Sequence, residues 1–397
     1  MGGFLPTAVI GLTGSFGSGC SKIAEEIIVP GGYRLLSLTA YLKERYVQET
    51  GQDNPARPQL QGFGTALREK NGADCLARLA IEEMRKQSEC KKWVIDSIKN
   101  PHEAEALRRE FSNFFLMGVF ADKDVRLKRL ENLYGDDVNA FNREDRTDSR
   151  EGVEHGQRVA ACFYSADLVI ANNESAPKNS DADAKLRSLV KYYISGMEVR
   201  YSLSPTEDEA LMTMAYANGQ RSSCLKRKVG AVIIDKDRHL FSSGYNEVPS
   251  EEKSCKQANG KCNRDSVRDE IKEALDAVVQ DPEERKGVHG VIDSLKVLDR
   301  CRALHAEENA IINVARFGSA VALSEARLYT TTYPCMMCAN KIARVGIKEL
   351  IYFEPYPSEE TRKILKTGSV TERPFQGVTA RAYFRFFLGG VSRGTVP

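Results

Sequence analysis

The sequence lacks the features that would direct the chain to a membrane. No apolar run is long enough to span a bilayer, which takes about 20 residues, and no charged, apolar and then small-residue signal peptide opens the chain. We therefore expect a cytoplasmic protein with no membrane partner. Its ten cysteines, several at spacings typical of metal ligands, are then expected to be reduced and to bind metal.

An excess of charge of one sign is also missing. The chain has 57 Lys and Arg against 55 Asp and Glu, a formal net charge of +2. A large nucleic-acid-binding surface normally shows a marked positive excess, so nucleic acid is not favoured as a partner, although local basic patches are compatible with this composition. The length of 397 residues exceeds one ordinary domain and predicts two hydrophobic cores.

The residues most informative about function lie in two short segments of the second half. His305 and Glu307 belong to His-Ala-Glu, and Cys335 and Cys338 belong to Pro-Cys-Met-Met-Cys. One imidazole and two thiolates give three zinc ligands and leave the fourth tetrahedral position open for water, as in a catalytic site. A structural zinc site would instead need a fourth protein ligand and would have no use for the glutamate.

Glu307 is the predicted catalytic acid and base. Since it is not needed as a ligand, it can move protons for a zinc-bound hydroxide. The pattern H-x-E…P-C-x-x-C is typical of zinc enzymes that deaminate nucleobases. We expect His305 and Cys335 each to open a helix, because the amide groups at a helix start favour thiolate over thiol.

Strands and helices alternate in the first half, which predicts a parallel sheet with helices on both faces. Short apolar runs predict strands at residues 8–12, 93–96, 114–120 and 167–170, and helical segments are expected between them, such as 74–87 and 103–110. In the second half we expect strands at 228–235, 327–331 and 350–353.

A glycine-rich segment follows the first predicted strand. It has the spacing of a phosphate-binding loop, whose backbone N–H groups cradle phosphates and whose last residue can reach Mg²⁺; the residues concerned are Gly14, Gly17, Gly19, Cys20 and Ser21. The lysine that such loops use at the β- and γ-phosphates is missing, because Cys20 holds its position, and Lys22 would project from another side of the helix. The sequence thus favours nucleotide binding over phosphoryl transfer.

Composition divides the chain into two domains and a linker. Residues 172–183 have linker composition, and a helix at 184–195 is expected to cross to the next domain. Ser204 and Pro205 are typical of a helix cap and first helical position. The predicted organisation is 1–175, a linker with a helix at 176–203, and 204–397 with a charged, partly helical insertion at 251–300.

The second half resembles the deoxycytidylate deaminase family. The resemblance is carried by Arg221–Cys224, Val229–Ile233, Gly244–Pro249 and the two zinc segments. It implies a cytidine-deaminase-like α/β/α sandwich that converts free dCMP, dCTP or both to deoxyuridine nucleotides. It also implies that Asn246 contacts the substrate, although Gly-Tyr-Asn alone would read as a turn. Glu247 stands where the family usually has glycine.

Further residues of this half are candidates for substrate and metal. Arg221 and Lys228, in a compact basic cluster, would contact substrate phosphates or a regulatory nucleotide; the alternative is a solvated face. Tyr356 stands near the position at which the family often has a tyrosine that closes over the base. The alternative is that Tyr356 is an aromatic residue of the core. Some family members carry a second, structural zinc in these regions, which makes four further cysteines its candidate ligands: Cys224, Cys255, Cys262 and Cys301.

The first half resembles P-loop nucleoside and nucleotide kinases. Beyond the loop, Val94–Pro101 resembles their strand-end acid motif and Arg143–Arg146 their arginine-bearing lid. A lysine-less P-loop domain fused to such a deaminase resembles a bacterial family that deaminates dCTP and dCMP in antiphage defence. We also expect a homo-oligomer. Three alternatives stay open: a deaminase of tRNA or single-stranded nucleic acid, a nucleotide sensor, and a first domain kept for assembly or allostery.

Overall fold

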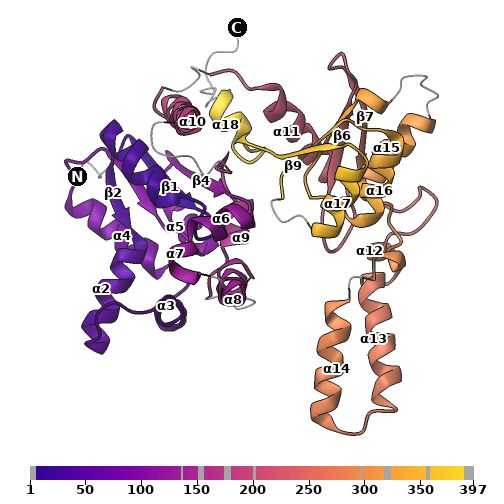
Figure 1. Ribbon diagram of the computed structural model, residues 1–397, viewed down its shortest axis with the longest axis horizontal. Helices are drawn as coiled ribbons and strands as arrows, with labels where there is room; N and C mark the ends of the chain where they lie inside the picture. The colour runs from indigo at the N-terminus through magenta and orange to yellow at the C-terminus, as the bar shows by residue number, and fades with distance from the viewer. Residues whose placement is uncertain are drawn as a thin grey trace. The chain divides into compact units, whose positions relative to one another are not determined.

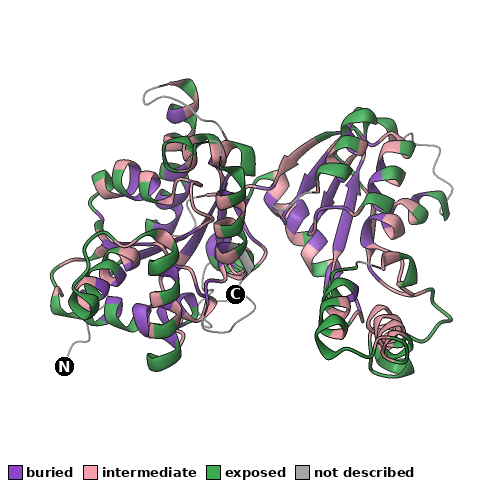
Figure 2. Ribbon diagram, turned by 60° about the horizontal axis from the view of Figure 1, so that its bottom comes forward, coloured by how far each residue is buried: buried purple, intermediate pink, exposed green. Residues whose placement is uncertain are grey.

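The computed structural model forms two compact units. The first unit contains Met1–Glu209 and Gln376–Pro397, and the second contains Ala210–Phe375. Residues 6–135, 137–150, 156–173, 180–199, 203–295, 297–316, 323–354 and 358–388 are described. Within these ranges no helix is long and apolar enough to cross a membrane. In both units the inner strands of the sheet are largely buried and the helices around them expose their outer faces (Figure 2).

The first unit is built on a six-stranded sheet with the order β11-β5-β4-β1-β3-β2. Strands β1, β2 and β4 of this sheet are labelled in Figure 1. Strands β1 to β5 run parallel, as predicted, and β11 pairs antiparallel with β5. The central strand β1 is buried at all six positions, because a parallel sheet is covered on both faces. The strand bounds are β1 Ala8–Thr13, β2 Arg34–Ser37, β3 Lys92–Asp96, β4 Phe114–Phe120, β5 Leu168–Ala171 and β11 Gly377–Val378.

Helices follow these strands, and local caps explain several of their starts. At the start of α5 the Asn100 side chain accepts a hydrogen bond from the His102 N–H at 2.9 Å, and Glu103 accepts one from the Asn100 N–H at 3.0 Å. The bounds are α1 Cys20–Ile23, α2 Leu38–Thr50, α3 Arg57–Asn71, α4 Cys75–Lys86, α5 Pro101–Glu110, α6 Lys123–Arg129, α7 Glu131–Tyr134, α8 Val138–Arg150, α9 Val159–Tyr164, α10 Asp181–Glu198 and α18 Tyr383–Phe387. A π-turn (η1, Ala24–Ile28) and a 3-10 turn (η2, Val29–Gly31) extend α1.

The division of the chain differs from the predicted boundaries at both ends of the second half. The helix expected as a linker, α10, packs Val190 and Tyr193 into the core of the first unit, and Phe386 joins them there. Residues 376–388 therefore belong to the first unit. The predicted range 204–397 had placed them in the deaminase-like half, which is wrong. Hydrophobic burial explains the return, because these side chains cover the face of the sheet that would otherwise meet water.

The helix expected at Ser204 and Pro205 begins later. Helix α11 spans Glu207–Gly219, and its cap is Thr206. The Thr206 N–H donates to the Glu209 carboxylate at 2.7 Å, and the Glu209 N–H donates back to the Thr206 hydroxyl at 3.3 Å. This reciprocal pair satisfies two amides at once, which is why Thr206 and not Ser204 starts the helix.

The second unit is built on a five-stranded sheet with the order β10-β9-β8-β6-β7. Strand β6 is antiparallel to β7 and β8, and β8, β9 and β10 are parallel to one another. The strand bounds are β6 Gly230–Ile234, β7 Leu240–Tyr245, β8 Arg327–Thr330, β9 Glu349–Tyr352 and β10 Thr371–Pro374.

Two glycines show that helices cover both faces of this sheet. Gly230 pairs with Tyr245, and Ala231 pairs with Gly244, so the two glycines face opposite sides. A Cβ at Gly230 would collide with the backbone of α11 at Ala215, and one at Gly244 with the backbone of α15 at Ala306. Helices α15 (Ala306–Arg316), α16 (Met336–Val345) and α17 (Glu359–Thr367) lie together on one face (Figure 1). The α/β/α sandwich is thus confirmed.

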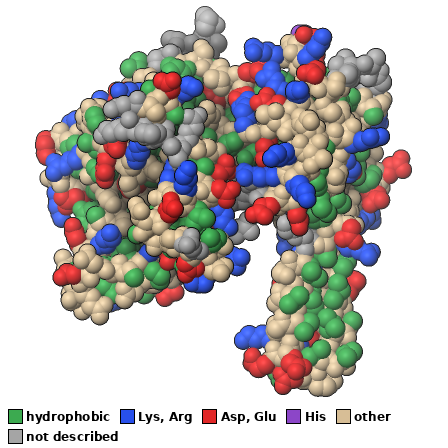
Figure 3. Space-filling view, viewed as in Figure 1, with side chains coloured by type: hydrophobic (Ala, Val, Ile, Leu, Met, Phe, Trp, Pro, Cys, Tyr) green, Lys and Arg blue, Asp and Glu red, His purple; other side chains and the backbone are tan. Residues whose placement is uncertain are grey.

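The charged insertion forms a helical hairpin. After a short turn α12 (Cys255–Ala258), α13 (Asn263–Asp276) and α14 (Pro282–Ser294) run side by side (Figure 1). Lys272 pairs with Asp293 at 2.6 Å across the hairpin. Apolar side chains gather along one face of it (Figure 3). Its large exposed apolar side chains are Val278, Val291 and Leu295. The hairpin therefore buries little apolar surface within this chain.

Candidate functional site

The structure brings His305, Cys335 and Cys338 together in the second unit. His305 directly precedes α15, Cys335 caps α16, and Cys338 lies in the first turn of α16. The His305 Nδ1 atom is 3.3 Å from the Cys335 Sγ atom and 3.5 Å from the Cys338 Sγ atom. Tetrahedral zinc with its usual bond lengths would place nitrogen and sulfur about 3.5 Å apart. The three side chains therefore fit a zinc ion without rearrangement.

No other metal-ligand group of this kind occurs in the described parts of the chain. Among those residues, this is the one set of three or more His, Cys, Asp or Glu side chains whose ligand atoms all lie within 4.8 Å of one another. Three ligands, one imidazole and two thiols, match the donor set of a catalytic zinc and leave one position open.

The protons of the cluster are shared among its members. A hydrogen bond with Cys338 lowers the pKa of Cys335 to about 4, and the same contact raises the pKa of Cys338. Hydrogen bonds with Cys301 and then Cys335 raise the pKa of His305 to about 10. A cation bound between these groups would displace the shared protons, as metal binding to thiols and imidazole generally does.

Glu307 lies beside this cluster and not in it. It occupies the first turn of α15, is only 3% exposed, and interacts with the Cys338 side chain. Burial raises its pKa to about 7, so the carboxyl can both take up and release a proton near neutral pH. The neighbouring Glu308 differs, because it forms an ion pair with Lys341 and accepts a hydrogen bond from the His305 N–H.

The four cysteines considered for a second zinc line one small cavity of about 20 Å³, and all four are free thiols: Cys224, Cys255, Cys262 and Cys301. Their sulfur atoms are not gathered within 4.8 Å of one another. Cys301 also forms a hydrogen bond with His305, which lowers the pKa of the Cys301 thiol. Groups that hydrogen-bond a ligating histidine fix its ring orientation, so Cys301 links this cavity to the first cluster.

Asn246 is buried and ties down the start of β6. Its Oδ1 atom accepts a hydrogen bond from the Val229 N–H at 2.8 Å, and its Nδ2 atom donates to the Arg227 carbonyl at 2.9 Å. An amide has two N–H donors and two oxygen lone pairs. One donor and one lone pair of Asn246 are therefore still available for a ligand.

The basic cluster, which consists of Arg221 and residues 226–228, separates into two kinds of residue. Lys226 pairs with Asp265, and Arg227 forms a two-pronged ion pair with Glu354. Arg221 instead stacks over the Tyr245 ring at 4.5 Å, and the Lys228 ammonium donates to the Gln220 carbonyl at 3.1 Å. Both are exposed, and among the described residues neither pairs with a carboxylate.

Tyr356 lies outside the described residues. Its proposed closure over the base therefore rests on the sequence resemblance.

The glycine-rich loop (residues 14–21) joins β1 to α1 in the first unit. Gly17 and Gly19 adopt positive φ angles of 79° and 100°, which side chains other than glycine rarely tolerate. Burial raises the pKa of the Cys20 thiol to about 12, so the residue at the lysine position is neutral. The Lys22 ammonium pairs with Asp183 at 2.9 Å.

The acid at the end of β3 reaches this loop. The Ser21 hydroxyl donates to the Asp96 carboxylate at 2.8 Å, and Asp96 is buried. A hydroxyl beside a carboxylate is a usual arrangement for Mg²⁺ ligands next to a bound phosphate. These two residues could hold such an ion.

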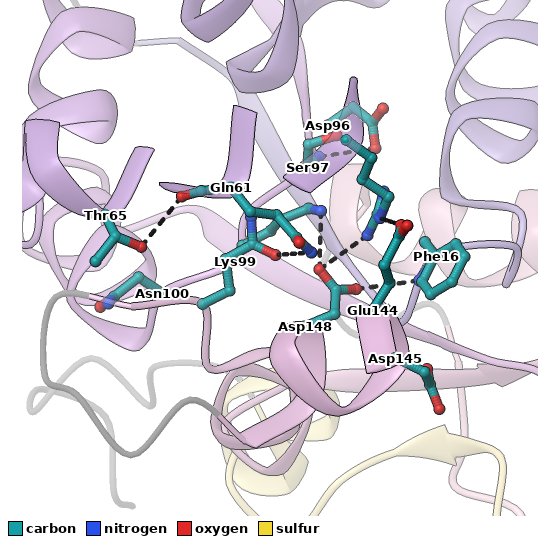
Figure 4. Close-up of polar contacts among 12 residues, drawn as sticks. Phe16, Gln61, Thr65, Asp96, Ser97, Lys99, Asn100, Glu144, Asp145 and Asp148 are labelled. Atoms are coloured by element: carbon teal, nitrogen blue, oxygen red, sulfur yellow. Dashed lines mark hydrogen bonds and ion pairs between the residues drawn. The ribbon is translucent and has the colours of Figure 1, made fainter. Parts of the chain in front are cut away.

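Three charged residues that the sequence analysis did not identify as a group meet at the same loop. A cavity of about 460 Å³ extends from residues 14–22 to Arg57 and Lys99, and Asp148 of α8 contacts both of these cations (Figure 4). No sequence signal joins these three residues, because they lie on separate elements far apart along the chain. In the segment expected to resemble an arginine-bearing lid, the acids Glu144 and Asp145 pair with Arg57 and Arg126.

Comparison with known proteins gives a consistent result for the second unit. Residues 205–354 match the family model of the cytidine and deoxycytidylate deaminase zinc-binding region. A deoxycytidylate deaminase of Mycobacterium phage D29 is 34% identical over 149 residues, which cover 37% of this chain and 94% of the phage protein.

Two fungal relatives extend this comparison. The deoxycytidylate deaminase of Schizosaccharomyces pombe is 26% identical over 379 residues, 94% of this chain and 98% of that protein. For the deoxycytidylate deaminase of Saccharomyces cerevisiae the identity is 33% over 174 residues, which span 44% of this chain and 46% of that protein. A solved dCMP deaminase structure from cyanophage S-TIM5 aligns with 44% of this chain and all of that chain at 22% identity, with a TM-score of 0.29.

Proposed function

The chain belongs to the deoxycytidylate deaminase family, and from this premise we propose that it is a zinc-dependent enzyme that deaminates dCMP to dUMP and ammonia. One observation carries the proposal. His305, Cys335 and Cys338 present a three-ligand metal centre, and the buried Glu307 lies beside it without being one of the ligands. This separation of ligands from a proton carrier is what hydrolytic deamination of a base requires.

The residues divide the reaction between them. His305, Cys335 and Cys338 would hold the metal, which when bound supplies the Lewis acidity that turns water into a nucleophile at neutral pH. Glu307 takes one proton of the attacking water and passes it to the ring nitrogen N3 of cytosine. It then takes the remaining proton of the new C4 hydroxyl and passes it to the amine, so the C4–N bond breaks and ammonia leaves. Its burial suits this role, because a carboxyl with a pKa of about 7 exchanges protons at low cost in both directions.

A substrate panel tests the proposal. Metal-replete protein would be incubated with dCMP, dCTP, CMP, deoxycytidine and tRNA, with ammonia release as the readout. Ammonia release from dCMP at a rate far above the rates with CMP and with tRNA supports the proposal. Release from tRNA and not from dCMP would contradict it and would favour a nucleic-acid deaminase.

We extend the proposal to dCTP as a second substrate. The support is the combination of a glycine-rich loop without lysine and a deaminase half in one chain, which resembles the bacterial antiphage family. A role in antiphage defence by dCTP depletion rests on that resemblance alone. A fungal deoxycytidylate deaminase matches nearly the whole chain, which is why dCMP is placed first. Comparison of kcat/KM for the two nucleotides decides between them.

Three residues are proposed to bind the substrate. The available donor and lone pair of Asn246 suit a polar edge of the nucleoside, and the exposed cations Arg221 and Lys228 suit its phosphate. Tyr356 is proposed, on the resemblance, to cover the base.

A second, structural zinc is proposed in the cavity lined by four cysteines, Cys224, Cys255, Cys262 and Cys301. Four sulfur ligands form a closed site. Such a site would attach the helical hairpin to the rest of the second unit, because two of the four cysteines lie where the hairpin begins.

For the first unit we propose a kinase-like P-loop domain that binds a regulatory nucleotide, with Mg²⁺ at Ser21, and that turns it over slowly. Gly14, Gly17, Gly19 and Cys20 would line the phosphates. The sheet order supports this, because β1 lies between β3 and β4, where consecutive connections diverge and α/β sheets usually bind ligands. We further propose that the enzyme acts in the cytoplasm as a homo-oligomer.

A further inference from the structure

Asp148 is the most unusual residue near the glycine-rich loop. Its side chain is fully buried, yet it comes from α8, a largely polar helix. One carboxylate oxygen accepts a hydrogen bond from the backbone N–H of Phe16 at 3.3 Å. The other lies 3.1 Å from the Lys99 ammonium and 3.0 Å from the Arg57 guanidinium (Figure 4). One buried anion therefore meets a loop amide and two cations.

These groups are the kind that bind a phosphate group in proteins. Amides of a glycine-rich loop, a lysine and an arginine are the common ligands of phosphate oxygens. Burial by itself would raise the pKa of Asp148, but the nearby Lys99 and Arg57 lower it below the ordinary value, so the carboxylate stays charged. The charged Asp148 carboxylate thus lies at the backbone N–H of Phe16 in the glycine-rich loop.

Lys99 and Arg57 also replace a charge that the loop itself lacks. Cys20 holds the position of the usual lysine, and burial keeps its thiol neutral. Lys22 is held by Asp183. The cations that face the Phe16 amide therefore come from the segment after β3 and from the start of α3.

A second observation points to a ligand in the same cavity. Arg68 is only 2% exposed and lines the cavity. Its Nε and Nη2 atoms donate to Glu103 at 2.9 and 2.7 Å, but its Nη1 atom is buried without a hydrogen-bond partner among the described residues. A buried donor left unpaired is costly, and an acceptor on a bound molecule would remove that cost.

We propose that Asp148 occupies the place of a phosphate group, and that a nucleotide polyphosphate displaces it and binds Lys99 and Arg57 instead. The inference rests on the proposed nucleotide binding at the loop. It adds that binding is a competition between two anions. Displacement frees Asp148 together with Glu144, one helical turn earlier, which lies 3.4 Å from Arg57. The ligand therefore loosens the C-terminal end of α8, while Asp145 keeps its ion pair with Arg126.

Calorimetry on the full-length protein tests the competition, with ATP and with inorganic tripolyphosphate as probes. Asp148→Asn keeps an acceptor for the Phe16 N–H and removes the competing charge, so both probes should bind about tenfold tighter or more. Lys99→Met should weaken both about tenfold or more. Asp137→Asn is the matched control, because Asp137 lies at the start of the same helix, where Asn caps equally well, and its affinity should not change.

Hydrogen exchange of the unmodified protein provides a test that does not depend on a variant. ATP should increase the rate of backbone amide hydrogen exchange in the last turn of α8, residues 147–150. Slower or unchanged exchange there with ATP bound would overturn the competition, as would equal affinities of Asp148→Asn and the unmodified protein. In both cases nucleotide binding at the loop would stand. If neither probe binds any of the proteins, the proposed nucleotide site fails together with the inference, and the deaminase proposal is unaffected.

Discussion

The metal-ligand cluster of the second unit and the glycine-rich loop of the first unit differ in where their chemistry is encoded. The cluster takes its ligands from two helix starts at most 33 positions apart. The loop meets Asp148 from 132 positions away, and its cations come from two further elements. A metal site depends on particular side chains, so its motif can be recognised in the sequence. A phosphate-binding loop depends mainly on backbone N–H groups, and the charged residues around it can come from any part of the chain.

We expect the largest effect from a substitution of Glu307 in the second unit. Glu307→Gln should lower the rate of dCMP deamination by roughly 10²–10⁴-fold, because it removes the proton carrier. Zinc content should not change, because no ligand is removed. The rate is measured from dUMP formation and the metal by elemental analysis. Glu308→Gln is the matched control and should keep most of the activity, and near-full activity of Glu307→Gln would refute the assigned roles.

The dispersed network of the first unit should be sensitive to a single buried residue. Glu103 accepts hydrogen bonds from Arg68 and from the Lys99 and Asn100 N–H groups. Glu103→Ala would leave Arg68 buried and unpaired, so this unit should lose about 3–5 kcal/mol of unfolding free energy. The single tryptophan, Trp93, is buried in β3, so its fluorescence in a urea titration reports this unit.

The control for this experiment lies on the same helix. Glu105 is exposed, and Glu105→Ala should change the unfolding free energy by less than about 0.5 kcal/mol. Similar tryptophan transitions for the two variants would show that the Glu103 network contributes little.

A second zinc ion is proposed where the helical hairpin begins. We expect about two zinc ions per chain, and Cys255→Ser with Cys262→Ser should remove about one of them. Cys90→Ser, in the first unit, serves as the control. Elemental analysis of purified protein gives the stoichiometry, and one zinc per chain before and after the double substitution would exclude the structural site.

The smallest expected effect concerns substrate phosphate. Lys228→Gln should raise KM for dCMP about tenfold with little change in kcat, because one charged contact contributes about 1.4 kcal/mol. Deoxycytidine, which has no phosphate, should not respond. Lys236→Gln, on another exposed turn of the same unit, is the control. An equal response of dCMP and deoxycytidine would remove Lys228 from the phosphate site.

Sequence reasoning succeeded where the physical signal was local. Strands β1 and β4 were predicted because they are continuous apolar runs. The proximity of His305, Cys335 and Cys338 was predicted because their spacing is specific. Strands β2, β7 and β10 were missed, because each is short or has partly exposed polar positions. The return of residues 376–388 to the first unit was missed for another reason, since only the assembled core shows where Phe386 is needed.

One incubation tests the contrast between the two units most directly. The metal-replete protein is mixed with dCMP and ATP labelled at the γ-phosphate, and dUMP and transferred or released phosphate are measured in the same samples. We expect rapid formation of dUMP, with phosphate transfer or release much slower. The proposed proton carrier Glu307 lies beside the three proposed metal ligands, whereas the loop carries Cys20 in place of lysine. Rapid phosphorylation of dCMP without formation of dUMP would contradict it.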